Sequence, residues 1–391
     1  MSLPRNYYKL TLLVFLLLGC YATTEKKKII RATDDSLAYY PPTPPKVSKQ
    51  EFRRCYREAK DFYENVLERS RFNGAMLVAK NGEIVYEKYA GFQHMGQKDS
   101  ITVNTPFHLA SVSKTFTGMA TLKLWEEGKL QLQDEVSKYL TGFPFTGVTI
   151  KTLLNHRSGL PNYVYFMEQL GWDRKKTISN QDVLQFMIDH KQQLNEGKPD
   201  RHFSYCNTNY ALLALIIEKV SGKTYADYLK ETFFTPLKME NTFVFSMDKA
   251  DSVMPSYNWK NRKEAFTFLD AVYGDKNIYS TPRDLLKWDA ALSYSNLFKT
   301  STLDSAYSGY SFERPGIKNY GLGWRMYIYP NNKKIIYHNG WWHGNNTVFT
   351  RLVQDSATII ILGNRYNRRI YDAKKLYASF GKYDGTDDSD E

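Results

Sequence analysis

The sequence predicts an α/β (α+β) fold, in which helices flank an antiparallel sheet and an inserted, mostly helical domain divides that sheet. Two observations predict it: strand-like runs occur near both ends of the folded region, and a long stretch with helical periodicity separates them. The chain is also long enough for a large core, with 391 residues, 42% hydrophobic and 24% charged. These proportions are typical of globular proteins rather than disordered ones.

The first half of the sheet follows an N-terminal helix. Between Glu51 and Arg71, apolar residues recur at the spacing of one helix face, at Phe52, Cys55, Ala59, Phe62 and Val66. The next segment, "NGAMLVAKNGEIVYEKYAGF", contains two short apolar runs joined at Asn81-Gly82. Asn-Gly between alternating segments is a strong hairpin signal, so we expect two adjacent antiparallel strands here.

The middle of the chain, from about Ser111 to Phe234, is expected to be mostly helical. Its clearest pieces are "NQDVLQFMIDHKQQL" and "TNYALLALIIEKVSGKTYADYLKETFF". Strand-like runs return near the end as "KKIIYHNG", "NTVFTRLVQ" and "ATIIILGN", with polar turns between them. A last helix is predicted in "NRRIYDAKKLYASF", whose apolar face carries Ile370, Ala373, Leu376 and Phe380.

The N-terminus carries a targeting signal rather than a folded element. Arg5 and Lys9 precede an apolar run that ends at Leu18 and is too short to span a bilayer, as in secretory signals. Its ending, "LLGC", resembles a bacterial lipoprotein signal, so we predict a signal peptide at residues 1–19 and a lipidated Cys20. The alternative is an ordinary signal peptide that is cut a few residues later. The lipoprotein prediction makes the protein exported, periplasmic or cell-surface, and lipid-anchored to a bacterial membrane.

Composition predicts the domain limits. Residues 20–49 are polar, charged and proline-bearing, which predicts an extended tether between the anchor and the folded domain. The basic residues of this tether either lie against anionic lipid head groups or belong to a solvated linker. We expect the folded domain at residues 50–381, with a helical subdomain at about 111–250 inserted in the sheet domain. Residues 382–391 form an acidic tail.

Charge and composition disfavour several functional classes. The formal net charge is +12, but no nucleic-acid-binding motif is present, so acidic cell-surface polymers or the membrane face are better partners. The seven histidines include no HExxH, and His338 and His343 are not spaced as two ligands on one helix face. We therefore predict no metal and no cofactor. Cys55 and Cys206 are far apart in sequence and do not indicate a disulfide framework.

The segment "FHLASVSKTFTG" allows two interpretations of one helix start. Ser111 and Lys114 are three residues apart and share a helix face. Either Ser111 caps the helix and Lys114 is solvated, or Ser111 is a nucleophile that Lys114 helps to deprotonate, with Ser113 as an alternative nucleophile. SxxK recurs at Ser246 and Ser379, but only Ser111 opens a long amphipathic helix. The N-terminal amides of such a helix favour developing negative charge.

Two further segments offer partners for a nucleophile. Tyr205 and Asn207, in "FSYCNTNYALLALIIEKVSG", precede a strongly apolar helix, where a phenol can relay a proton and a carboxamide can hold a substrate amide. The alternative is a tyrosine packed at a helix start. In "YHNGWWHGNN", His338 and Gly340 lie at the end of a predicted strand, where glycine allows a substrate backbone to approach closely. The alternative there is a hairpin turn at Asn339-Gly340.

Taken together and in this order, the SxxK, YxN and HxG elements resemble the serine β-lactamase and penicillin-binding protein superfamily, in its class C-like branch. Sequence segments between and beside the motifs also resemble this superfamily: "TIKTLLNHRSGLPNY", "FTPLKMENT", "IYSTPRDLLKW" and "YGLGW". The likeness covers about Glu51 to Phe380. It implies the β-lactamase/transpeptidase-like fold, with the helical domain inserted in the sheet.

The resemblance also implies roles for individual residues. Ser111 would be the nucleophile that forms an acyl-enzyme, and Lys114 the neighbouring base or proton relay. Tyr205 would shuttle a proton to the leaving group, and Asn207 would contact the substrate amide. The backbone amides of Ser111 and Trp341 would form the oxyanion hole. One such donor is typically worth roughly a hundredfold to a thousandfold in rate.

One position departs from the most familiar members of the superfamily. β-Lactamases and many carboxypeptidases begin the third motif with lysine, which helps to hold a substrate carboxylate, whereas this chain has His338 before Gly340. Histidine is only partly charged near neutrality, so its attraction for a carboxylate should be weaker. The HxG variant resembles D-aminopeptidases and esterases.

The expected function is an exported serine hydrolase that attacks an amide or ester. Its substrate would be a D-amino-acid peptide, as for a D-aminopeptidase or D-Ala-D-Ala carboxypeptidase, or a small ester. A cell-wall peptide suits the compartment. The alternatives are a class C-type β-lactamase and, from another class, a catalytically silent binding protein that uses the same groove. An α/β-hydrolase is disfavoured because no serine lies in GxSxG.

Overall fold

The computed structural model describes residues 45–294 and 296–383. The predicted signal peptide, the lipidation site Cys20 and most of the tether and acidic tail lie outside these residues. Among the described residues, no helix is both long enough and apolar enough to cross a membrane.

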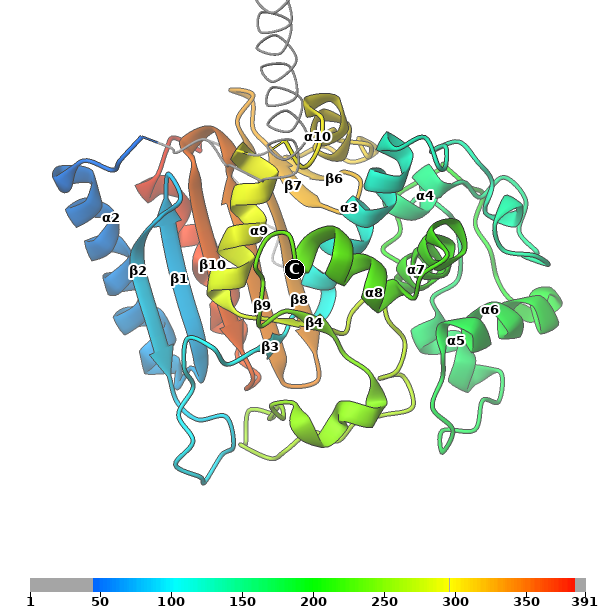
Figure 1. The fold of residues 1–391 in the computed structure, drawn as a ribbon, viewed down its shortest axis with the longest axis horizontal. Coiled ribbons are helices and arrows are strands. Elements are labelled where there is room, and N and C mark those ends of the chain that lie inside the picture. Colours follow the sequence, from blue (N-terminus) through cyan, green and yellow to red (C-terminus); the bar gives the residue numbers. More distant parts are fainter. Residues whose placement is uncertain (1–44, 295, 384–391) are drawn as a thin grey trace, which may run out of the picture. The chain divides into compact units, whose positions relative to one another are not determined.

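A seven-stranded antiparallel sheet organises the domain, in the order β2-β1-β10-β9-β8-β7-β6 (Figure 1). Two strands come from the N-terminal part of the chain and five from the C-terminal part, so the sheet is divided as the sequence predicts. The predicted fold class is therefore confirmed. The strands are β1 (Gly74–Lys80), β2 (Glu83–Ala90), β6 (Lys318–Tyr320), β7 (Arg325–Ile328), β8 (Lys334–Trp342), β9 (Asn345–Leu352) and β10 (Ala357–Gly363).

The β1–β2 connection is the predicted tight hairpin. Asn81 and Gly82 both have positive φ angles, 52° and 75°. Two consecutive residues in the left-handed region match the twist of the flanking strands, and asparagine followed by glycine adopts this conformation at little cost.

One face of the sheet packs against the two ends of the described chain. Helix α2 (Lys49–Phe62) and the C-terminal helix Arg368–Ser379 share a hydrophobic cluster with alternate residues of the strands. The expectation of a last helix with one apolar face is confirmed, but it is a 3₁₀ helix. Its buried residues Ile370, Ala373 and Leu376 recur every third position, the period of a helix with three residues per turn.

The remaining α-helices lie between the two halves of the sheet in sequence. Most of them belong to residues 113–229, called the helical segment below, which lies away from α2 in space (Figure 1, teal to green). A small sheet, in the order β3-β5-β4, connects this segment to the main sheet. These elements are α3 (Ser113–Glu126), α4 (Ile150–Leu154), α5 (Tyr163–Gln169), α6 (Asn180–Asp189), α7 (Asn207–Ser221), α8 (Tyr225–Leu229), α9 (Pro282–Tyr294), α10 (Thr300–Ala306), β3 (Phe107–His108), β4 (Phe243–Val244) and β5 (Ile278–Ser280).

Helix α3 is buried around its whole circumference. It is therefore not the amphipathic helix that the sequence predicted. Its threonines tolerate burial because their hydroxyls donate to carbonyls one turn back, as Thr115 does to Val112 and Thr121 to Thr117. The N-terminal end of α3 is therefore held rigidly inside the protein, between the helical segment and the sheet.

Candidate active site

Ser111 and Lys114 meet at the N-terminal end of α3. Ser111 lies in a 3₁₀ turn (Ala110–Val112) that leads into the helix, and its side chain is half-buried. Lys114 is fully buried and donates from Nζ to Ser111 Oγ at 3.1 Å and to the backbone carbonyl of Asp275 at 2.7 Å. Among the described residues, no carboxylate forms an ion pair with Lys114. A buried amine whose partners are a hydroxyl and a carbonyl is placed to exchange a proton with that hydroxyl.

The capping interpretation of this segment is wrong. Val112, not Ser111, occupies the cap position of α3, and Lys114 has no exposed surface. Ser113 is fully buried, and its hydroxyl accepts the backbone N–H of Ile278 at 3.1 Å. Of the two serines in this turn, the half-buried Ser111 is therefore the one that a substrate can reach.

Tyr205 lies on the other side of the lysine. The ring centroid of Tyr205 is 5.0 Å from Lys114 Nζ, and its buried hydroxyl has no hydrogen-bond partner within the described part of the chain. A buried phenol left unpaired is unfavourable unless a ligand completes its hydrogen bonds. Tyr205 can therefore offer its hydroxyl to a group that enters beside Ser111.

The other two residues of the second motif, Cys206 and Asn207, have different surroundings. Asn207 is the first residue of α7 and is half-buried, so it lies inside the helix rather than before it. Cys206 lies in the core: its thiol donates to the carbonyls of Leu160 and Pro161, and burial raises its pKa. Cys206 and Cys55 are both free and buried.

His338 is fully buried on β8. Its Nε2 lies 3.3 Å from the Tyr320 hydroxyl, and its Nδ1 is 2.7 Å from the carbonyl of Asn339. Burial, followed by the charges of Arg325 and Lys114, lowers the pKa of His338 well below its usual value. The imidazole is therefore neutral at pH 7, so it supplies hydrogen bonds here and not a positive charge.

Positive charge comes instead from Arg325, which the sequence analysis did not single out. Its guanidinium lies 5.0 Å from the centroid of the Tyr205 ring. This residue lies on β7, which pairs with β8. Only the pairing of the two strands brings it near the motifs, so no local sequence pattern could have identified it.

Gly340 brings β8 against the nucleophile turn. A Cβ atom at this position would lie 2.5 Å from the Leu109 carbonyl and 3.0 Å from the Ala110 Cβ, closer than real side chains approach. The absence of a side chain thus lets the strand run directly beside the residues that precede Ser111. Trp341 follows with a side chain that is 63% exposed, which makes it part of the rim of the site.

His156 is a second residue that the motifs did not reveal. Its carbonyl accepts the backbone N–H of Ser204 at 2.8 Å, and its Nδ1 accepts that of Cys206 at 3.1 Å. The His156 ring also packs 4.3 Å from the ring of Tyr205. These contacts hold the backbone on both sides of Tyr205. His156 has a φ of +56°, a left-handed conformation that is uncommon outside glycine.

The described residues include no group of three or more histidine, cysteine, aspartate or glutamate side chains that could hold a metal ion. The groups that do converge are a serine, a buried lysine, a phenol and a strand edge. These are the components of a serine hydrolase that works through an acyl-enzyme, with a lysine in place of the more familiar histidine.

Comparison with known proteins agrees with this class. The β-lactamase family model matches residues 52–378, and the chain belongs to that family of serine hydrolases. The chain is 34% identical over 339 residues to penicillin-binding protein 4* of Bacillus subtilis, which covers 81% of this chain and 73% of that protein. It is 27% identical over 341 residues to the teichoic acid D-alanine hydrolase of Staphylococcus aureus, covering 85% of this chain and 81% of that protein.

A solved structure shows the same fold. The penicillin-binding protein from Bacillus halodurans superimposes with a TM-score of 0.72 at 22% identity, and the match covers 81% of this chain and 98% of that one. The superfamily resemblance inferred from the motifs is confirmed.

Proposed function

We propose that this protein is an exported, lipid-anchored serine hydrolase that cleaves the ester or amide of a D-amino acid through an acyl-enzyme on Ser111. The observation that carries the proposal is the buried contact of 3.1 Å between Lys114 Nζ and Ser111 Oγ. Among the described residues, Lys114 has no carboxylate partner, and its amine is placed to exchange a proton with Ser111 Oγ.

The proposed reaction has two halves. Ser111 Oγ bonds to the substrate carbonyl carbon while its proton passes to Lys114, and the carbonyl oxygen becomes an oxyanion. The backbone N–H groups of Ser111 and Trp341 donate to that oxyanion. Tyr205 passes its hydroxyl proton to the leaving oxygen or nitrogen as the bond from that atom to carbon breaks, and the proton taken up by Lys114 then moves to Tyr205. Water then attacks the ester on Ser111, which releases the acid and restores the hydroxyl.

Asn207 and the strand at Gly340 are proposed to align the substrate. Asn207 begins α7 beside Tyr205, so its carboxamide is available to an amide of the substrate. Gly340 leaves the edge of β8 close to the nucleophile turn. His338 orients Tyr320 instead of anchoring a carboxylate, because it is buried and neutral.

The D-amino-acid preference rests on the relatives, one of which is described as a hydrolase of D-alanine on teichoic acid. Charge supports a substrate with an anionic leaving group, since Arg325 lies beside Tyr205 and the whole chain carries +12. We therefore favour a D-alanyl ester or amide on a negatively charged wall component. A class C-type β-lactamase is less well supported because the third motif lacks a cation at His338.

Intact-mass spectrometry with a fluorophosphonate probe tests the nucleophile. Wild type should gain one adduct and Ser111→Ala none. Ser113→Ala is the matched control, since Ser113 lies two residues further on and its hydroxyl accepts the backbone N–H of Ile278. It should still gain the adduct. No adduct on folded wild type would favour the silent binding protein.

A substrate panel tests the class of acyl group. Esters and amides of D-alanine with anionic and neutral leaving groups should be hydrolysed faster than their L-alanine counterparts. The anionic leaving groups should give the higher kcat/KM. Faster hydrolysis of a chromogenic cephalosporin than of any D-alanyl compound would overturn the proposal in favour of a β-lactamase.

A further inference from the structure

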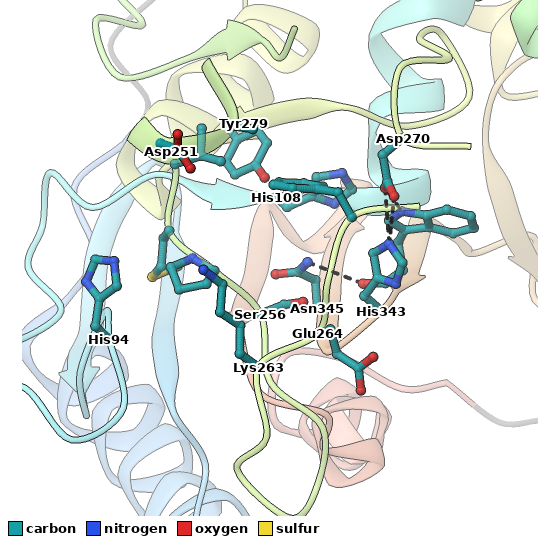
Figure 2. Close-up of a pocket in the computed structure, with 16 residues that line it drawn as sticks. His94, His108, Asp251, Ser256, Lys263, Glu264, Asp270, Tyr279, His343 and Asn345 are labelled. Atoms are coloured by element: carbon teal, nitrogen blue, oxygen red, sulfur yellow. Dashed lines mark hydrogen bonds and ion pairs between the residues drawn. The ribbon is translucent and has the colours of Figure 1, made fainter. Parts of the chain in front are cut away.

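A polar network lies partly in the wall of a small cavity of about 70 Å³ (Figure 2). The cavity is lined by His108, Asp270, Trp342, His343 and Asn345 among others, and not by Ser111, Lys114 or Tyr205. Its lining residues come from the β2–β3 connection, from β3, from the segment before β5 and β5 itself, and from the ends of β8 and β9 with the turn between them. The network therefore links these segments of the chain through residues other than Ser111, Lys114 and Tyr205.

The first part of the network begins one residue before the nucleophile. The backbone N–H of Ala110 donates to Nδ1 of His108 at 3.0 Å, so the proton of the neutral ring is on Nε2. That proton is donated to Oδ1 of Asn277 at 2.9 Å. Ala110 has a φ of +48°, so the turn that presents Ser111 is held in a conformation that alanine rarely adopts.

The second part begins at Asn277 and ends at the other side of the active site. Nδ2 of Asn277 donates to the backbone carbonyls of Asp270 at 2.6 Å and Val272 at 2.9 Å. The buried carboxylate of Asp270 accepts Nε1 of Trp342 at 2.5 Å and lies 3.0 Å from Nε2 of His343. Figure 2 shows the carboxylate pointing at the His343 ring. Both polar groups of the Asn277 side chain are thus used between the two ends.

The two ends of this network are the two sides of the proposed oxyanion hole. One end fixes Ala110, directly before Ser111, and the other fixes Trp342 and His343, directly after Trp341. A hydrogen bond from Thr347 Oγ1 to the Leu109 carbonyl, at 2.8 Å, ties the same two segments at a second point. Oxyanion donors act strongly only when their positions are fixed before the reaction.

We propose that Asn277, between His108 and Asp270, is a positioning residue that sets the separation of the two oxyanion-hole amides. This inference rests on the proposed function, since it assigns the Ser111 and Trp341 N–H groups to the oxyanion. Asn277 touches neither the nucleophile nor the substrate. It acts through the backbone at both ends, so its loss lowers the rate of acylation rather than the affinity for substrate.

The variant Asn277→Gly tests the inference. Asn277 has a φ of +74°, which glycine adopts without strain, so this substitution removes the side-chain bonds and keeps the backbone conformation. The matched control is Asn180→Ala. Asn180 is equally buried and also bonds to backbone groups, of Ala211 and Tyr273, but it lies in the helical segment.

The readouts are kcat and KM for a D-alanyl ester, the rate of fluorophosphonate labelling, and Tm. We expect Asn277→Gly to lower kcat and the labelling rate about tenfold to a hundredfold with KM within about twofold. Asn180→Ala should lower Tm by a similar amount but keep kcat within about threefold of wild type. Asn277→Asp keeps an acceptor for His108 but places a second carboxylate oxygen against the carbonyls of Asp270 and Val272, so it should not recover the lost rate.

Wild-type kcat in Asn277→Gly would overturn the inference, and so would equal kcat losses in Asn277→Gly and Asn180→Ala. If wild type itself neither turns over the ester nor reacts with the probe, the proposed function fails instead. The two failures are therefore distinguishable.

Discussion

Two buried lysines lie close together in this protein and have opposite surroundings. Lys114 contacts the Ser111 hydroxyl and a backbone carbonyl. Lys276 is buried to a similar degree, but its Nζ contacts the Tyr163 hydroxyl and lies 3.4 Å from the carboxylate of Asp275. Lys276 thus has a counter-charge, and Lys114 has none among the described residues.

The comparison contrasts a lysine in an ion pair with the lysine that we propose as the base. Burial lowers the pKa of Lys276, and the carboxylate of Asp275 acts in the opposite direction. An ion pair of this kind resists deprotonation because losing the proton would leave the carboxylate unpaired. Among the described residues, Lys114 forms hydrogen bonds to a hydroxyl and a carbonyl and no ion pair, so no ion pair has to be broken when it exchanges a proton with Ser111. Asp275 serves both sites: its carboxylate pairs with Lys276 and its carbonyl positions Lys114.

The largest expected effect is on the rate of acylation in Lys114→Met. Removing the base should slow fluorophosphonate labelling of Ser111 about a thousandfold, within the range of general-base catalysis. Tm should be unchanged or higher, since a buried amine is replaced by an apolar chain. Lys114→Arg should not restore the rate, because a guanidinium does not release its proton. A Lys114→Met protein that labels at the wild-type rate would show that Lys114 is not the base.

In contrast to Lys114→Met, the variant Lys276→Met should cause a large loss of stability. Removal of one partner of a buried ion pair costs about 3–5 kcal/mol, because it leaves the other charge uncompensated. Unfolding in urea measures this loss. The double variant Lys276→Met, Asp275→Asn should regain much of it. If the single variant unfolds at the wild-type urea concentration, the ion pair has no structural role.

Acid should destabilise the network beside Lys276. Burial lowers the pKa of His108 to about 4, with the charges of His343 and Lys276 acting in the same direction, and the bond to Asn277 and the charge of Asp270 opposing. A histidine whose folded pKa lies below its unfolded value binds fewer protons when folded. The contribution of neutral His108 to the free energy of unfolding is therefore fully present above about pH 6.5, and it is lost as the pH drops towards 4.

The size of this acid effect follows from the shift in the pKa of His108. The free energy of unfolding falls by on the order of 3 kcal/mol once the pH is below 4. Unfolding free energies measured between pH 7 and pH 4 should fall less steeply in His108→Gln than in wild type, since glutamine does not titrate. Parallel slopes for the two proteins would contradict the assignment of His108 as a buried neutral group.

The smallest expected effect is that of Tyr163→Phe. The hydroxyl of Tyr163 donates to the Asp275 carboxylate at 3.0 Å and contacts Lys276 Nζ. Its loss should cost about 1–3 kcal/mol of stability, the usual range for a buried hydrogen bond to a charged group. The labelling rate of Ser111 should stay within about threefold of wild type. A large fall in that rate at unchanged stability would mean that the ion pair takes part in the chemistry.

Features encoded by neighbouring residues could be predicted from the sequence. Asn81-Gly82 specified the hairpin through its backbone preferences, and the strand-like runs at both ends specified a divided sheet. The order of the motifs then identified the family. The meeting of Ser111 with Lys114 also followed from their spacing, since residues three apart share a helix face.

Features that depend on distant segments could not be predicted. The residues next to His338 in the sequence do not show whether it is solvated or buried. Its pKa is lowered by burial in the folded protein and by the charges of Arg325 and Lys114. Arg325 and His156 reach Tyr205 through strand pairing and through a loop contact, respectively. Asn277 looks like an ordinary loop residue until the fold places it between His108 and Asp270.

The most direct test of the Ser111–Lys114 assignment is rapid-quench mass spectrometry with a D-alanyl ester. The proposed mechanism predicts a D-alanyl adduct on the peptide that contains Ser111, formed within the time of one turnover in wild type and at least about a hundredfold more slowly in Lys114→Met. Turnover without any adduct on that peptide, or an adduct on a different serine, would contradict it.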